Sequence, residues 1–237
     1  MKDSHEELAK LQRELRKKGS KEKAKKSAWF FKTGEGQYGA HDKFLGVTVP
    51  EVRVLAKQYR DLPLVELHEL LQSQFNEERL LALIILIDQY RCLNATVKQK
   101  IFTFYLKERR QVNNWNLVDS SAHYIVGETL VTEERTLLYR LLSSKNMWER
   151  RIAIIATWAF IKRGDLDDTF AIAEKLFADK EDLMHKAVGW MLREAGKKDQ
   201  KRLKMFLLKH IKIIPRTTLR YAIERFPVDE RKGMLLR

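Results

Sequence analysis

Apolar residues recur every three or four positions along most of the chain, which is the spacing of one helix face. Leu8, Leu11 and Leu15 share such a face in a helix predicted over residues 4–18, and Gly19 ends it. Pro50 and Pro63 each open a further helical segment, because proline fits the first turn of a helix. Beyond them we predict helices over residues 77–91, about 96–108, about 115–130, 133–142, 148–162, 166–178, 183–195, 199–209 and 215–225. The pattern therefore predicts an all-α protein.

The predicted helices also repeat. Arg151, Lys186 and Arg220 begin similar stretches of sequence in similar segments, at spacings of 35 and 34 residues. A period of about 35–40 residues made of two helices is typical of α-solenoids of HEAT, armadillo or tetratricopeptide type. Because one helix pair cannot bury its apolar face alone, stacked antiparallel pairs are expected, with one curved concave surface.

The amino-acid composition argues against a disordered chain and against an all-β fold. A hydrophobic content of 44% excludes wholesale disorder. The chain has only 10 Gly and 4 Pro, which argues against a β-sandwich or barrel with a turn every 8–12 residues or so.

The net charge of +14 is unevenly distributed. Residues 1–60 hold 15 Lys/Arg against 8 Asp/Glu, residues 193–237 hold 14 against 5, and the middle is nearly neutral. Such a field attracts nucleic acid or an anionic membrane, although basic helices can also be no more than a solvated surface. We therefore predict an α-solenoid of HEAT-like repeats with a concave basic groove. It is expected to form a single domain over residues 1–237, with residues 1–26 as a basic N-terminal helix and lead-in.

Several classes of protein are disfavoured. The longest apolar run, Leu80 to Ile87, is far shorter than the roughly 20 residues of a membrane span, and no secretory signal is visible. A lone cysteine, Cys92, fits a reducing compartment, so we expect a cytoplasmic protein, in the cytoplasm or nucleoid of a bacterium. Gly34, Gly36 and Gly39 form a GxGxxG pattern, but no strand precedes it, which makes a dinucleotide site improbable. The six histidines lack metal-ligand spacing, so neither a metal nor a cofactor is expected.

Tryptophans share predicted helix faces with charged residues at three places: Trp115 with Asp119, Trp148 with Arg151, and Trp190 with Lys186 and Arg193. A functional site on the concave surface would use such pairs. Taken singly, however, a tryptophan at helical spacing is more often part of the core, and an arginine more often part of a surface ion pair.

Five motifs, in matching order from about residue 25 to the end, resemble the AlkD family of DNA alkylation-repair glycosylases. They lie at residues 42–53, 114–119, 148–153, 185–194 and 215–222. The resemblance implies HEAT-like repeats that hold duplex DNA on their concave face. It also implies hydrolysis of the N-glycosidic bond of cationic N3- or N7-alkylated purines, without enclosure of the lesion.

The resemblance also assigns site residues. Asp119 matches the catalytic carboxylate, Trp115 and Trp190 the two site tryptophans, and Arg151 an arginine that contacts the DNA backbone. Phe30 stands where a DNA-contacting tyrosine is expected, and Asn116 where an aspartate is expected. Lys186, Arg193 and Trp148 complete the expected DNA-binding set.

The chemistry agrees with that assignment. An alkylated purine that is already cationic leaves as a neutral base, so one carboxylate that stabilises the oxocarbenium-like sugar is sufficient. The expected partner is double-stranded DNA containing alkylated purines, with no membrane and no metal, and we expect a monomer. Two alternatives remain, which are a non-enzymatic helical-repeat protein that binds nucleic acid and a protein-interaction scaffold.

Overall fold

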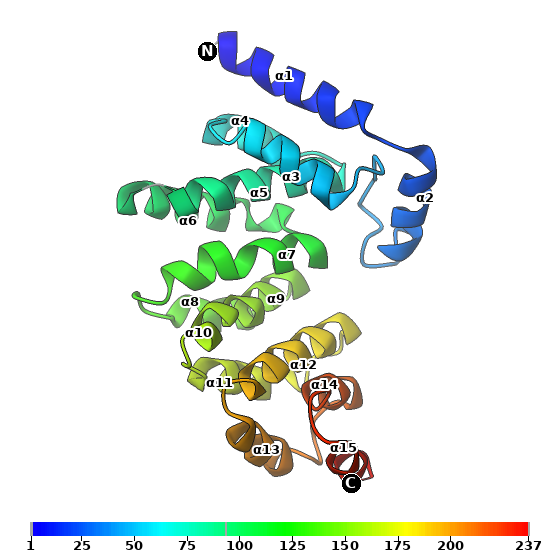
Figure 1. The fold of residues 1–237 in the computed structure, drawn as a ribbon, viewed down its shortest axis with the longest axis vertical. Coiled ribbons are helices and arrows are strands. Elements are labelled where there is room, and N and C mark those ends of the chain that lie inside the picture. The colour runs from blue at the N-terminus through cyan, green and yellow to red at the C-terminus, as the bar shows by residue number, and fades with distance from the viewer. Residues whose placement is uncertain (1, 93, 237) are drawn as a thin grey trace. The chain divides into compact units, whose positions relative to one another are not determined.

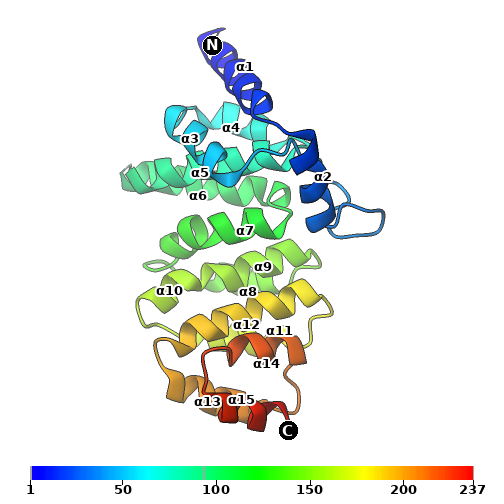
Figure 2. The same cartoon turned by 45° about the vertical axis from the view of Figure 1, so that its right-hand side comes forward.

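The computed structural model describes residues 2–92 and 94–236, and throughout these the regular elements are helices. Contacts divide the chain into two compact units, Met1–Ser121 and Ala122–Arg237. Figures 1 and 2 follow the helices of each unit in chain order. The all-α fold predicted from apolar periodicity is confirmed. The single domain over residues 1–237 and the concave groove involve both units and stay predictions.

The N-terminal unit is built around one helix. Its helices are α1 (Lys2–Lys17), α2 (Lys21–Phe30), α3 (Val49–Gln58), α4 (Leu64–Leu71), α5 (Asn76–Cys92), α6 (Ala95–Glu108) and α7 (Trp115–Ala122), the last ending at the boundary with the second unit. Helix α5 packs against α3, α4 and α6, and it is buried on nearly all sides. A run of apolar residues without helical alternation, Leu80 to Ile87, is what such a central helix requires.

The chain between α2 and α3 is tied to the start of α5. Lys43 forms an isolated parallel bridge with Phe75, with backbone hydrogen bonds of 2.9 Å from Lys43 to Gln74 and from Asn76 to Lys43. Three backbone N–H groups, those of Leu45, Gly46 and Val47, donate to the carboxylate of Glu77 in α5. This loop therefore holds the motif that begins at Asp42 close to the first turn of α5.

The C-terminal unit contains the repeats predicted from the 35- and 34-residue spacings. Its elements are the π-helix η2 (His123–Gly127), α8 (Thr136–Leu142), α9 (Met147–Ala156), α10 (Trp158–Lys162), α11 (Asp167–Leu176), α12 (Asp182–Gly196), α13 (Gln200–Lys209), α14 (Arg216–Ala222) and α15 (Val228–Leu235). Helix α12 packs on α9 and on α14, so the three helices that carry the repeated stretches are successive neighbours. At Gly189 of α12, a Cβ would lie only 2.5 Å from the Cβ of Tyr221, so glycine permits this close packing.

The structure differs from the predicted helices at several places. The helix predicted over about 115–130 changes to a π-helix at His123–Gly127. Residues 21–26, predicted as a basic lead-in, belong to helix α2, which continues to Phe30. The first turn of α2 is capped by Ser20, whose Oγ accepts a hydrogen bond from the backbone N–H of Lys23. The helix predicted over 148–162 divides at Thr157, whose hydroxyl donates to the carbonyl of Ile154 at 2.7 Å. Helix α15 was not predicted, because its eight residues bury only Met234.

Among the described residues, no helix has the length and apolar content that a bilayer span requires. The same residues contain no group of histidine, cysteine or acidic side chains arranged to hold a metal ion.

Candidate functional site

The start of α7, which carries Trp115 and Asp119, is fixed by a buried polar network. The side chain of Asn114 accepts a hydrogen bond of 2.7 Å from the backbone N–H of Trp115, and it donates to Asp42 at 2.6 Å. Asp42 also accepts hydrogen bonds from Asn76 at 2.8 Å and from the guanidinium of Arg79. Asp42, Arg79 and Asn114 are all buried, so α7 begins at a point defined by one enclosed ion pair.

Electrostatics keep Asp42 ionised. Burial alone would raise its pKa, but the hydrogen bonds from His41, Asn114 and Arg79, together with the charge of Arg79, hold the pKa below its ordinary value. An ionised carboxylate only accepts hydrogen bonds, so Asp42 can accept from all of these donors at once.

Asn116, where the resemblance led us to expect aspartate, joins this network from the second position of α7. Its Nδ2 donates to Asn76 Oδ1 at 2.7 Å, and Asn76 Nδ2 lies 3.4 Å from Asn116 Oδ1. A reciprocal amide pair of this kind needs no charge on residue 116. The asparagine therefore forms a hydrogen bond to α5 at the position where an aspartate was expected.

An aromatic stack holds Trp115. Its indole lies parallel to the ring of Phe31, with centroids 4.9 Å apart, and Phe31 stacks in turn on Phe44 at 4.9 Å. Phe30 meets Trp115 edge to face at 5.8 Å. Phe31 thus covers one face of the half-buried indole. Phe30 and Trp115, which the resemblance assigned as separate site residues, are therefore in ring contact.

Asp119 lies one turn after Trp115 on α7 and is half-buried. Its charge reaches the buried hydroxyl of Tyr105 in α6, which hydrogen-bonds to Ser121 at 3.0 Å. Burial, with a smaller contribution from Asp119, raises the pKa of Tyr105 well above its ordinary value. Tyr105 is therefore a neutral neighbour, and Asp119 is a half-buried carboxylate beside an aromatic surface.

A cavity of about 340 Å³ lies behind the aromatic stack in the same unit. Phe31, Phe44, Val47 and Leu80 form much of its apolar wall; Asn76, Asn116 and Thr48 add polar groups, and Lys23 and Lys26 also line it. Sequence reasoning found no source for such a cavity, because its walls come from four separate stretches of chain.

A second aromatic group lies in the C-terminal unit. Trp190 of α12 meets Trp158 at 5.2 Å, and Trp158 contacts His123 at 4.5 Å. The ammonium of Lys162 lies 4.8 Å from the centre of the Trp158 ring and 5.2 Å from that of Tyr124. Trp158 was missed, although Trp158 and Lys162 have the same i, i+4 spacing that selected Trp115 with Asp119.

Trp148 and Arg151 of α9 are more buried than the other residues predicted to contact DNA. Trp148 is 6% exposed, Arg151 is 5% exposed, and the Arg151 guanidinium donates to the carbonyl of Leu183 in the first turn of α12. In this position Arg151 links two neighbouring repeats. A contact to DNA from either side chain stays a prediction, and it requires the side chain to turn outward.

Lys186 and Arg193 of α12 are half-exposed and have carboxylate neighbours. Lys186 lies 2.6 Å from Asp182, and its hydrogen bond is the main reason that the pKa of Asp182 is lowered. Arg193 pairs with Glu224 and lies 3.7 Å from Glu194. A phosphate would have to compete with these carboxylates.

The predicted site residues are divided between the two units. The N-terminal unit contains Trp115, Asp119 and Phe30, and the C-terminal unit contains Trp190, Arg151, Lys186, Arg193 and Trp148. Their union in one site stays a prediction.

Comparisons with known proteins agree with this picture. A family model described as DNA alkylation repair enzyme matches residues 11–226. Among solved structures, a predicted DNA alkylation repair enzyme from Enterococcus faecalis aligns with a TM-score of 0.70 at 17% identity, covering 89% of this chain and 98% of that one. A likeness at that identity shows a common fold. No curated protein matches the chain.

Proposed function

Because the chain belongs to the family of DNA alkylation repair enzymes, we propose that it is a DNA glycosylase. It would hydrolyse the N-glycosidic bond of cationic N3- or N7-alkylated purines in duplex DNA. The observation that carries the proposal is the half-buried Asp119 one turn after Trp115, on a helix whose start is anchored by the buried Asp42 network.

Asp119 would act on charge that develops at the sugar. As the C1′–N bond breaks, its electron pair neutralises the positive ring of the leaving purine, and positive charge grows on the sugar. A carboxylate beside the sugar stabilises that charge and orients the water that adds to C1′. The base leaves neutral, so no proton has to be delivered to it.

The tryptophans would bind the cationic base. Indole faces attract a cation with about 0.5–2 kcal/mol each. Phe31 covers one face of Trp115, so the base would meet the opposite face. Trp190, held by Trp158, offers a second indole. Two such contacts would favour binding of a cationic purine over a neutral one and so help to select the substrate.

Phosphate contacts would position the duplex without reading its sequence. Phe30 is exposed beside Trp115 and can contact the DNA backbone directly. Lys186 and Arg193 can exchange their carboxylate neighbours for phosphates, because both are half-exposed. Trp148 and Arg151 would contribute mainly by holding α9 against α12.

A panel of duplexes tests the proposed reaction, each with one lesion. We expect release of 7-methylguanine and 3-methyladenine and no release of uracil or 8-oxoguanine, with free base measured by chromatography. The reason is that a neutral base must leave as an anion, and Asp119 supplies no proton for it. Efficient uracil release would show that a general acid acts at this site and would overturn the mechanism.

DNA binding should depend strongly on salt and little on sequence. Each neutralised phosphate contributes about −0.9 to the slope of log affinity against log salt. We therefore expect a steep negative slope, equal for two unrelated duplex sequences, in fluorescence anisotropy titrations. A slope near zero would favour the protein-scaffold alternative. A steep slope without base release would favour a non-enzymatic nucleic-acid-binding protein.

A further inference from the structure

The end of α2 exposes two aromatic side chains to solvent. Trp29 is 76% exposed and Phe30 is 55% exposed, and α2 has no buried residue. Tryptophan usually gains most from burial of its large apolar ring, so an indole left this exposed marks a surface that meets a partner.

The backbone holds these two side chains firmly. The helix ends with hydrogen bonds from Phe31 to Ser27 at 2.8 Å and from Thr33 to Ala28 at 3.1 Å. Lys32, directly after it, adopts a left-handed conformation with φ of 55°, which is unfavourable for a residue other than glycine. Strained conformations of this kind persist where the surrounding structure fixes them, often at functional sites.

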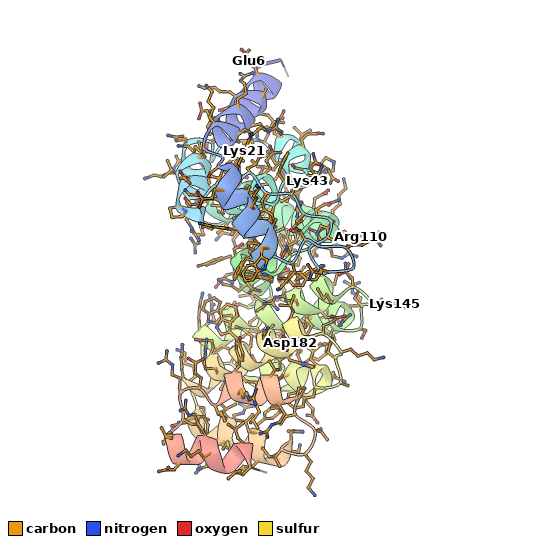
Figure 3. The ribbon with its side chains drawn as sticks, turned by 90° about the vertical axis from the view of Figure 1, so that its right-hand side faces the viewer. Glu6, Lys21, Lys43, Arg110, Lys145 and Asp182 are labelled. Atoms are coloured by element: carbon orange, nitrogen blue, oxygen red, sulfur yellow. The ribbon has the colours of Figure 1, made fainter. Side chains whose placement is uncertain are left out.

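Positive charge surrounds the exposed indole. The exposed lysines of α2 and its end are Lys21 (labelled in Figure 3), Lys23, Lys25, Lys26 and Lys32. Lys32 lies 5.2 Å from the centre of the Trp29 ring, and the acidic residue of the helix, Glu22, pairs with Lys26. The combination of an exposed aromatic ring with a basic helix fits a partner that presents both phosphates and flat apolar surfaces, which is nucleic acid.

This surface is continuous with the candidate site. Trp29 precedes Phe30, whose ring contacts Trp115, and Asp119 follows one turn later on α7. Trp29 therefore lies on the same helix end as Phe30, within the unit that carries Trp115 and Asp119.

We propose that Trp29 is a wedge that stacks on a base exposed next to the lesion, while the lysines of α2 bind the flanking phosphates. The inference rests on the proposed DNA glycosylase function and adds a DNA-contacting residue to it. Apolar wedges of this type enter between base steps, and a weakened or unpaired step opens most readily. The contribution of Trp29 should therefore be larger on damaged DNA than on an intact duplex.

A membrane surface fits α2 less well than DNA. An interfacial helix needs an apolar face along its length, with basic residues on the opposite face. In α2 the two aromatic residues occupy only the last turn, and lysines occupy both faces of the preceding turns.

Binding to two duplexes of the same sequence tests the inference. One duplex carries a tetrahydrofuran abasic analogue, which cannot be hydrolysed, and the other is intact. We expect Trp29→Ala to weaken binding to the abasic duplex about fivefold or more and to weaken binding to the intact duplex less. Trp29→Phe, which keeps a ring that can stack, should retain binding to within about twofold. Acrylamide quenching should show that the abasic duplex shields the Trp29 indole.

Lys25→Ala is the matched control. It removes a phosphate contact, so it should weaken both duplexes equally and reduce the salt slope by about 0.9, whereas Trp29→Ala should leave the slope unchanged. Equal losses on the two duplexes for Trp29→Ala, or no loss, would overturn the wedge. So would unchanged DNA binding with lost binding to vesicles of phosphatidylglycerol and phosphatidylcholine. If the wild-type protein binds neither duplex, the proposed function fails together with the wedge.

Discussion

Replacing Asp119 with asparagine should slow base release by about 10²–10³-fold, the typical cost of removing one preorganised electrostatic group. Affinity for duplex DNA should stay the same or rise, because the lost carboxylate repels phosphate. The change keeps the size of the side chain on a half-buried position of α7, so the fold should persist. Single-turnover release of 7-methylguanine gives the rate, and anisotropy gives the affinity.

Asp88→Asn is a matched control for this substitution. Asp88 is also half-buried in the N-terminal unit, but it lies near the end of α5. The Asp88→Asn protein should release base at the wild-type rate. An Asp119→Asn protein that excises nearly as fast as wild type would remove Asp119 from the proposed mechanism.

Replacing Asp42 with asparagine should lower the free energy of unfolding by about 3–5 kcal/mol, the usual cost of leaving one partner of a buried ion pair uncompensated. Arg79, 2% exposed, would be left as that uncompensated charge. The start of α7 should loosen as well, because Asn114 connects Asp42 to the backbone of Trp115. Urea denaturation followed by circular dichroism measures the first effect, and the rate of base release reports the second.

Two variants sharpen the Asp42 test. Glu78→Gln breaks another ion pair of the same unit, but its partner Arg16 has a side chain 52% exposed and can turn to water, so the loss should be clearly smaller. Adding Arg79→Met to Asp42→Asn removes the orphaned charge and should recover part of the loss. If Asp42→Asn costs no more than Glu78→Gln, the buried pair is not the anchor described here.

The same network predicts a dependence on pH. The pKa of Asp42 is lower in the folded protein than in the unfolded chain, so its contribution to stability is present above the unfolded pKa. That contribution is lost as the pH falls through the folded pKa, below about pH 4. The wild-type protein should therefore lose stability more steeply in acid than Asp42→Asn does.

The spacing of apolar residues predicted most of the helices correctly but predicted their ends less well. It found most core helices because they present an apolar face, whereas α5 is marked by a continuous apolar run instead. It missed α2 and α15 because those helices bury almost nothing. The division at Thr157, where the side-chain hydroxyl bonds to the carbonyl of Ile154, is not visible in the apolar pattern.

Among the site residues, spacing found pairs on one helix but not contacts between distant segments. Asp42 reaches Asn76 across 34 residues and Asn114 across 72, so only the folded chain reveals the network. Spacing also could not tell an exposed arginine from a buried one. Arg151 shares a helix face with Trp148 as predicted, yet its guanidinium lies against α12.

The proposed function requires that the protein breaks the glycosidic bond of an alkylated purine. Incubation with a duplex carrying one 7-methylguanine, followed by mass analysis of both the free bases and the DNA strand, tests it directly. We expect free 7-methylguanine and a strand with one abasic site in equal amounts. A strand that still holds 7-methylguanine, or one in which guanine has been restored, would contradict it.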